Sequence, residues 1–163
     1  MGLFDAFIKI DTITGESDDS KHKGEIEVFS FSWGVAQTGS SSSGTGAGSG
    51  KAQVNDFSFS KITDKSSPVL FMKCCTGEHI ASALFTCRKA GGTPVEFLKY
   101  KFTDVIITGV TTGGNSQGSE VPKEQITLGF TKCEIDYQGQ GPDGKPLGGP
   151  VHGGWNMKTN VVA

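Results

Sequence analysis

The chain has 163 residues, of which 24 are glycine and 20% are charged, with 15 lysine and arginine residues against 17 aspartate and glutamate residues. This length suits one domain with a sizeable core, and the composition favours short strands joined by turns over long amphipathic helices. The net charge of -2 excludes a general attraction to nucleic acid or to an acidic membrane surface, so we expect protein partners.

The first residues, MGLFDAFIKIDT, have neither the basic start nor the continuous apolar run of a signal peptide. No stretch of the chain approaches the length needed to cross a bilayer. Ala6 stands where a myristoylation signal needs serine or threonine. We therefore expect a protein that is made in the cytoplasm and is not inserted into a membrane.

Alternating apolar and polar residues predict strands over most of the chain. In chain order they cover 3–10, 24–35, 54–62, 80–89, 95–110, 124–138 and 153–162. One helix is predicted over 64–77, with Asp64 or Ser67 as its N-cap, Pro68 in its first turn and Gly77 as its end. One short helix among many strands predicts a mainly β fold in a single domain, 1–163: a small β-barrel or two-sheet sandwich with a flanking helix and a long extended hairpin loop.

The second and third predicted strands alternate between aromatic residues and serine. The serines are Ser30, Ser32, Ser58 and Ser60, and the aromatic residues are Phe29, Phe31, Trp33, Phe57 and Phe59. Because successive side chains of a strand point to opposite faces, the aromatic residues should enter a core and the serines should share one face. An ordinary solvated sheet face carries more charge than this. The pattern predicts either the wall of a channel, or another surface that handles proteins, or a plain solvent-exposed face.

Between these two strands lies the sequence GSSSSGTGAGSGK. A phosphate-binding loop is excluded, since Thr45 replaces its first glycine, Ala52 replaces its metal-binding hydroxyl, and a strand follows where a helix is required. The composition is that of a flexible connection, and we predict the tip of a hairpin that contacts a neighbouring subunit or ring. The predicted contact residues are Gly39, Ser40, Ser41, Ser42, Ser43, Gly44, Thr45, Gly46, Ala47, Gly48, Ser49 and Gly50.

The apolar alternation changes phase twice along the chain. Ile26 and Val28 are even-numbered and precede the odd-numbered aromatic residues, and the same change separates 126–130 from 133–137. A bulge near Val28 and Phe29 would explain the first change, as would a strand covered on both sides by its own core and by a neighbouring subunit. The two phase changes therefore favour an oligomer.

Catalytic and metal-binding patterns are missing from the sequence. Cys74 and Cys75 are adjacent, and no cysteine spacing fits a metal site, so we expect all four cysteines, Cys74, Cys75, Cys87 and Cys133, to be buried free thiols. The histidines His22, His79 and His152 fit no catalytic or zinc motif and are expected to be isolated on the surface. We predict no enzyme activity, no cofactor and no metal.

Two other function classes remain open at this point. A carbohydrate-binding β-sandwich should expose a flat aromatic platform, but Trp33 and Trp155 are the only tryptophans, and Trp33 alternates with the predicted core. A β-sandwich hydrolase would need a nucleophile with a base, or paired carboxylates, and no such arrangement stands out.

Several stretches together resemble the hemolysin-coregulated protein (Hcp) family, the tube proteins of bacterial type VI secretion systems. They are FIKI followed by GES, SWG before the Gly/Ser loop, FSFSKITDKSSP, RKAGG followed by VEFLKYKFTDVIITGVTTGG, IDYQ, and the ending GGPVHGGWNMKTNV. The similarity runs nearly end to end, and the order and spacing of the pieces make the combination specific.

This resemblance implies a small β-barrel that forms six-membered rings, which stack into a hollow tube driven out of the cell by a contracting sheath. It implies as partners further copies of the chain, the sheath, spike and baseplate proteins, and small effector proteins held in the lumen. Ser30, Ser32, Ser58 and Ser60 then become candidates for the lumen wall. It also implies that the protein leaves the cytoplasm without a signal peptide.

Overall fold

The computed structural model describes residues 3–37, 51–90, 94–118 and 121–163. Strands and one helix follow in the order β1 (Phe4–Ile10), β2 (Ile26–Val28), β3 (Ser30–Ser32), β4 (Val35–Gln37), β5 (Ala52–Val54), β6 (Phe57–Ile62), α1 (Ser66–Thr76), β7 (Ile80–Lys89), β8 (Glu96–Gly113), β9 (Lys123–Gly129), β10 (Lys132–Tyr137), β11 (Val151–Asn156) and β12 (Val161–Val162). The predicted mainly β class with one helix is confirmed.

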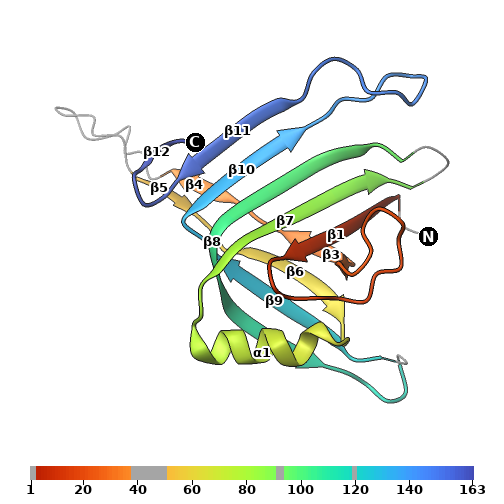
Figure 1. Ribbon diagram of the computed structural model, residues 1–163, viewed down its shortest axis with the longest axis vertical. Helices are drawn as coiled ribbons and strands as arrows, with labels where there is room; N and C mark the ends of the chain where they lie inside the picture. The colour runs from red at the N-terminus through yellow and green to blue at the C-terminus, as the bar shows by residue number, and fades with distance from the viewer. Residues whose placement is uncertain (1–2, 38–50, 91–93, 119–120) are drawn as a thin grey trace.

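The strands build two antiparallel layers (Figure 1). Sheet A has the order β12-β11-β10-β8-β7-β1-β2, and sheet B consists of β3, β6, β9 and the C-terminal half of β8. The short strands β4 and β5 pair only with each other among the described strands. Within the described residues the strand order does not close on itself, so the fold is an open two-sheet arrangement and not a closed barrel.

Strand β8 belongs to both sheets and joins them. Its first part pairs with β10 from Leu98 to Thr103, and its second part pairs with β9 from Ile106 to Gly113. Between them Asp104 has a positive φ of 54°, in the left-handed region that aspartate tolerates better than most residues. This irregularity lies where the strand passes from one sheet to the other.

Aromatic side chains fill the space between the inner faces of the two sheets. Phe57 and Phe59 of β6 are fully buried, as are Phe85 and Phe102 of sheet A. The Phe57 ring lies 5.0 Å from Phe102 and 5.1 Å from Phe85, measured between ring centroids, and four further rings surround it, those of Phe31, Trp33, Phe59 and Tyr100. Most of the alternating aromatic residues thus pack into the core, as predicted.

Phe29 is the exception, and it explains the first phase change. The chain bends at Phe29 as it leaves β2 in sheet A and enters β3 in sheet B, and the Phe29 side chain is 59% exposed. The expectation that Phe29 enters the core is wrong. A second change of sheet separates β9 from β10, which resolves the other phase change. Both arise within one chain, so they carry no evidence for a neighbouring subunit.

Helix α1 lies at one end of the longest axis of the molecule, and β11 lies at the other (Figure 1). The side chain of Asp64 accepts the N–H of Ser66 at 2.9 Å, although Lys65 directly precedes the helix. Gly77 ends the helix as predicted, in a left-handed conformation with its N–H donated to Lys73. Leu70 is buried against the core. None of the helices in the described residues is long and apolar enough to cross a membrane.

Candidate functional site

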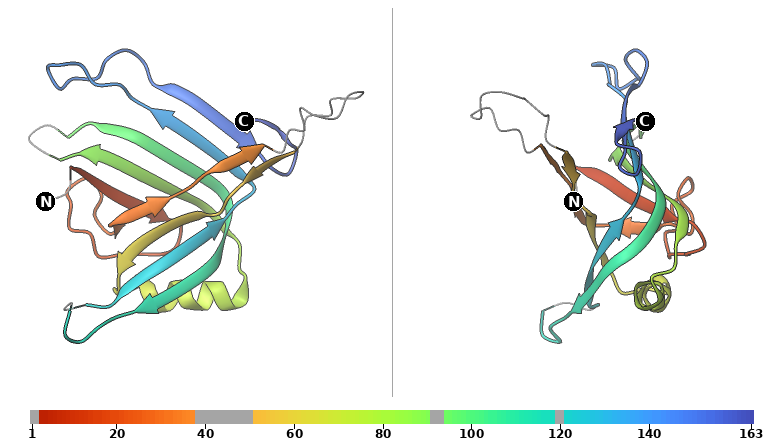
Figure 2. Two further views of the ribbon diagram at one scale, coloured as in Figure 1. Left: turned by 180° about the vertical axis from the view of Figure 1, so that it is seen from behind. Right: turned by 90° about the vertical axis from the view of Figure 1, so that its left-hand side faces the viewer.

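The outward face of sheet B brings together the predicted serines. Ser30 lies opposite Ser60, and Ser32 lies opposite Ser58, so all four side chains point away from the core. Figure 2, left, views the molecule from this side. Neighbouring strands add further uncharged polar residues, and we call the whole group the neutral face: Ser30, Ser32, Ser58, Ser60, Thr108, Thr111, Gln125 and Thr127.

The residues of the neutral face are positioned by the core on the other side of the same strands. Phe57 and Phe59 are fully buried, which fixes the outward direction of the alternating Ser58 and Ser60. The same holds on β9, where the buried Ile126 and Leu128 alternate with residues of the neutral face. Sequence analysis did not select the residues from β8 and β9, because the pairing of β6 with β9, and of β9 with β8, cannot be read from one strand alone.

The polar groups of the neutral face mostly bond to one another. The hydroxyls of Ser30 and Ser60 are 2.6 Å apart, and Gln125 donates to the hydroxyl of Ser58. Thr108 donates to Asp56 at 2.7 Å and lies 2.9 Å from the Thr127 hydroxyl. In the described part of the chain no hydroxyl of the four serines bonds to a histidine that could serve as a base. The face therefore presents hydroxyl and amide groups that are largely satisfied by one another and can form only weak hydrogen bonds to a partner.

The outward face of sheet A differs from the neutral face in charge. Lys99 lies opposite Asp136 and Lys101 lies opposite Glu134, so cations and carboxylates alternate across β8 and β10. Lys99 also pairs with Glu96 at 3.1 Å. The two outward faces of the molecule thus present different chemistry: one consists mostly of uncharged polar side chains, with Asp56 and Lys123 at its margin, and the other is charged.

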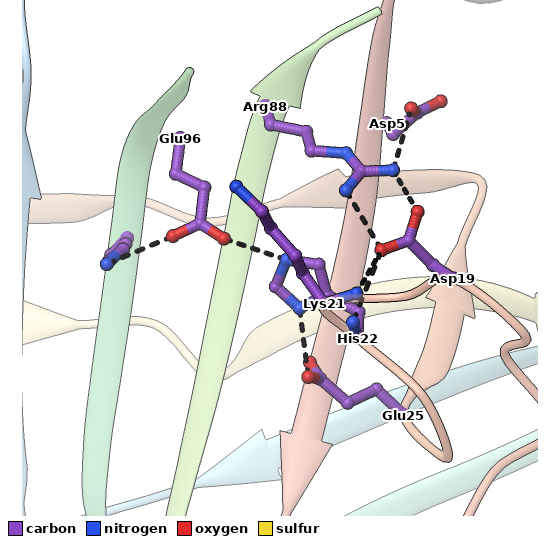
Figure 3. A network of polar contacts seen from close by, with 8 residues as sticks. Asp5, Asp19, Lys21, His22, Glu25, Arg88 and Glu96 are labelled. Atoms are coloured by element: carbon purple, nitrogen blue, oxygen red, sulfur yellow. Dashed lines mark hydrogen bonds and ion pairs between the residues drawn. The ribbon is translucent and has the colours of Figure 1, made fainter. Parts of the chain in front are cut away.

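A loop covers part of this charged face and holds a polar network (Figure 3). The ring of His22 stacks on Phe7 at 4.5 Å between centroids, and its two nitrogens each lie 2.9 Å from a carboxylate oxygen, of Glu25 and of Glu96. Arg88 also covers Phe7, and its guanidinium carbon lies 5.0 Å from the centroid of the Phe7 ring. The expectation that His22 is an isolated surface residue is wrong, because it is buried and shields an outward-facing phenylalanine.

Arg88 ties the same loop to sheet A through Asp19 (Figure 3). The hydrogen bond from Arg88 lowers the pKa of Asp19 from 3.8 to about 2, against the opposing effect of burial. Burial raises the pKa of Glu96, but the hydrogen bonds and charges of Lys99 and His22 outweigh it, and the net direction is downward. These carboxylates are therefore held in the ionised form that the network requires.

Replacing Asp19 with asparagine should lower the free energy of unfolding at pH 7 by roughly 1 kcal/mol, a modest effect because a fifth of the Asp19 side chain is in solvent. Since its folded pKa of about 2 lies below the ordinary 3.8, the stabilisation is complete above about pH 4 and is lost as the pH falls toward 2. Urea unfolding of the two proteins at pH 7, 4 and 2 measures how the stability loss caused by Asp19→Asn depends on pH. The exposed neighbour Asp18→Asn is the control, and a constant Asp19→Asn deficit down to pH 2 would contradict the assignment.

The remaining histidines and cysteines divide between surface and core. His79 pairs with Asp104 at 2.7 Å and His152 pairs with Asp136 at 2.8 Å, both on the surface as predicted. Cys87 and Cys133 are buried as predicted, and burial raises the pKa of the Cys87 thiol to about 12. The expectation is wrong for Cys75, which is exposed on α1, and Cys74 is half-buried. No group of three metal-binding side chains comes together in residues 3–37, 51–90, 94–118 and 121–163.

The Gly/Ser loop Gly39–Gly50 lies outside the described residues, but its base is visible. Strands β4 and β5 pair on either side of it, with Val35 opposite Val54 and Gln37 opposite Ala52. The segment thus joins two antiparallel strands, at the end of the hairpin that carries the four serines.

An open apolar groove of about 450 Å³ lies between this strand pair and sheet A. Trp33 and Trp155 line it with Tyr100 and Ile135. Trp33 is partly buried against the core, packs edge-on against Tyr100 and Phe102, and donates its ring N–H to the carbonyl of Asn55. Because the ring is embedded in this way, it does not offer the flat platform of a carbohydrate-binding module.

Comparisons with known proteins agree with one another. A family profile described as "Type VI secretion system effector, Hcp" matches residues 7–137. Protein hcp1 of Pseudomonas aeruginosa is 51% identical over 160 residues, which cover 98% of each chain. A crystal structure of Hcp1 from Salmonella typhimurium is 36% identical with a TM-score of 0.83, covering 99% of this chain and 100% of the other. A structure titled "Structure of a type six secretion system protein" is 33% identical with a TM-score of 0.92, covering 98% and 99%.

Proposed function

The chain belongs to the Hcp family of secreted type VI secretion tube proteins, and from this premise we propose that it forms a closed ring of six copies. The rings stack into a hollow tube that is exported by the secretion apparatus. The tube protein acts as a structural component and carrier, without a catalytic step of its own. Its partners are further copies of the chain, the sheath, spike and baseplate proteins, and small effector proteins.

The observation that carries the proposal is the contrast between the two outward faces. The neutral face would line the lumen, where uncharged hydroxyl and amide groups let varied cargo bind weakly and leave again. The charged face of sheet A, with its paired lysines and carboxylates, would face outward toward the apparatus. A face of mixed charge is well suited to water and to specific polar partners.

The loop Gly39–Gly50 would contact a neighbouring copy. The paired strands β4 and β5 carry it away from the serine-bearing part of the hairpin, so it starts at the edge of the folded domain. Its sequence offers Ala47 as its largest apolar side chain, so its own core gives it little to pack against. We therefore propose contact between rings as its role.

Replacing Ser32 with glutamine tests the lumen assignment. Ser32 is exposed on β3, so the larger side chain should change the free energy of unfolding by no more than about 0.5 kcal/mol and leave assembly intact. It should crowd the neutral face and reduce cargo retention by about tenfold. The readouts are co-purification of an effector with the ring, and its secretion by cells that carry the variant.

Ser82→Gln is the matched control, because Ser82 lies on β7 of sheet A and faces the other side of the molecule. It should assemble and retain cargo like the unmodified protein. Equal cargo retention by Ser32→Gln and the unmodified protein would reject the neutral face as the cargo surface. Unfolding of Ser32→Gln would reject its outward placement.

A further inference from the structure

The loop that covers part of the charged face of sheet A is attached to the sheet by a group that can gain or lose a proton. We call residues 15–25 the covering loop; its His22 stacks on Phe7 of β1 and contacts Glu96 of β8 (Figure 3). We propose that His22 is a proton-dependent latch, which holds the covering loop closed while its ring carries two protons and releases it when the ring loses one. The latch lies within one copy of the chain and does not depend on the proposed ring.

The geometry of the His22 ring requires a proton on both nitrogens. Nδ1 lies 2.9 Å from an oxygen of Glu25, and Nε2 lies 2.9 Å from an oxygen of Glu96. An ionised carboxylate can only accept a hydrogen bond, and a neutral imidazole has one N–H and one acceptor nitrogen. Only the imidazolium can therefore donate to both carboxylates. The neutral ring leaves one carboxylate facing a nitrogen lone pair, which replaces an attraction with a repulsion.

The surroundings of the ring also favour its charged form. The network around His22 holds four carboxylates and three fixed cations, which are Asp5, Asp19, Glu25 and Glu96, and Lys21, Arg88 and Lys99. The network is therefore neutral when the His22 ring carries its charge. The Phe7 ring lies parallel to it, with an angle of 7° and 4.5 Å between centroids, and the face of an aromatic ring attracts a cation.

The second attachment of the covering loop does not respond over the same pH range. The hydrogen bond with Arg88 lowers the pKa of Asp19 to about 2, and the hydrogen bond with Asp19 raises the pKa of Arg88. This pair therefore stays charged at neutral pH. A histidine ring ordinarily changes its charge between about pH 5 and 8. Near neutral pH, His22 is thus the attachment through which a proton can control the loop.

Opening of the covering loop changes the charged face of sheet A. Phe7 is buried, although it alternates with the core residues Ala6 and Ile8 and so points to the outward face. The covering loop supplies the cover that the core gives to its neighbours. Release of the latch should uncover the Phe7 ring, and it should leave Glu96 with Lys99 as its partner in the network.

Two measurements on the same samples test the latch from about pH 5 to about pH 9. Nuclear magnetic resonance of protein labelled with ¹³C at histidine Cε1 follows the His22 ring, and hydrogen–deuterium exchange with mass spectrometry follows the loop. Inside the loop the N–H of Ser17 is bonded to Glu25 and the N–H of Gly24 is bonded to Ser17, so their protection reports opening. Protection factors, which are corrected for the intrinsic pH dependence of exchange, should fall about tenfold as the pH rises through the range where His22 titrates.

Glu96→Gln separates the effect of the proton from simple packing. The amide introduced by this change can donate to Nε2 while the neutral ring donates from Nδ1 to Glu25, so both contacts survive the loss of a proton. Protection of the loop should then change by less than about twofold over the whole range. Glu25→Gln uses the opposite tautomer and should behave in the same way.

Asp136→Asn is the matched control, because it removes the carboxylate partner of His152 on the same face of the sheet. Its covering loop should respond to pH like that of the unmodified protein, and circular dichroism checks that each variant is folded. A loop that is equally protected at both ends of the pH range would overturn the inference. So would a loop that opens outside the range where His22 titrates, or a folded Glu96→Gln variant whose loop opens with pH as the unmodified protein does.

Discussion

Replacing Phe57 with alanine is expected to lower the free energy of unfolding by about 3–5 kcal/mol. Phe57 is fully buried at the centre of the space between the sheets, where its ring lies near those of Phe85 and Phe102. The substitution removes apolar contacts and leaves a cavity that the surrounding rings, held by both sheets, cannot fill. A loss of this size is a large part of the stability of an ordinary domain, about 5–15 kcal/mol.

Urea unfolding at low protein concentration measures this effect, so that assembly contributes little to the transition. Phe29→Ala is the control, because it removes the same side chain from a position that is 59% exposed. It should cost less than about 1 kcal/mol. Similar losses for the two variants would mean that Phe57 is not at the centre of the core.

Replacing Lys61 with methionine is the second change with a large expected effect. Lys61 is 1% exposed, and its ammonium group lies 2.6 Å from a Glu124 oxygen and 3.0 Å from an Asp64 oxygen. Methionine keeps the apolar stem but leaves two carboxylates without their cation. The expected loss is about 3–5 kcal/mol, the usual cost of breaking a buried ion pair on one side only.

The double variant Lys61→Met with Glu124→Met distinguishes the ion pair from simple packing. With both partners apolar, the double variant should be more stable than Lys61→Met alone by about 2 kcal/mol or more, so the two changes are not additive. Strict additivity in urea unfolding would contradict this account. Because Ser67 of α1 also bonds to Lys61 and Glu124, the cluster fixes the start of the helix.

Local alternation predicted much of the fold and part of the site. The strand predicted over 80–89 coincides with β7, and the alternation around Ser58 and Ser60 correctly separated the core side from the outward side. Both results follow from side chains that alternate within one strand. The residues that sequence analysis missed on β8 and β9 join the neutral face through strand pairing, which a single strand does not reveal.

The sequence did not reveal where the chain passes from one sheet to the other, or which residues with polar neighbours are buried. Periodicity tells which side of a strand is apolar but not which sheet the strand belongs to, so the bend at Phe29 resembled a bulge or a subunit contact. His22 has polar neighbours in the sequence, yet it is buried on Phe7. The exposed side of α1 could not be told from its core side, because apolar residues lie on both, with Phe71 and Met72 exposed and Leu70 buried.

Electron cryomicroscopy of the purified assembly tests the central claim most directly. We predict a closed ring of six copies in which the neutral face, including Ser30, Ser32, Ser58 and Ser60, lines the lumen and the charged face of sheet A lies outside. A ring with the charged face toward the lumen, or a protein that forms no ring at all, would contradict the account.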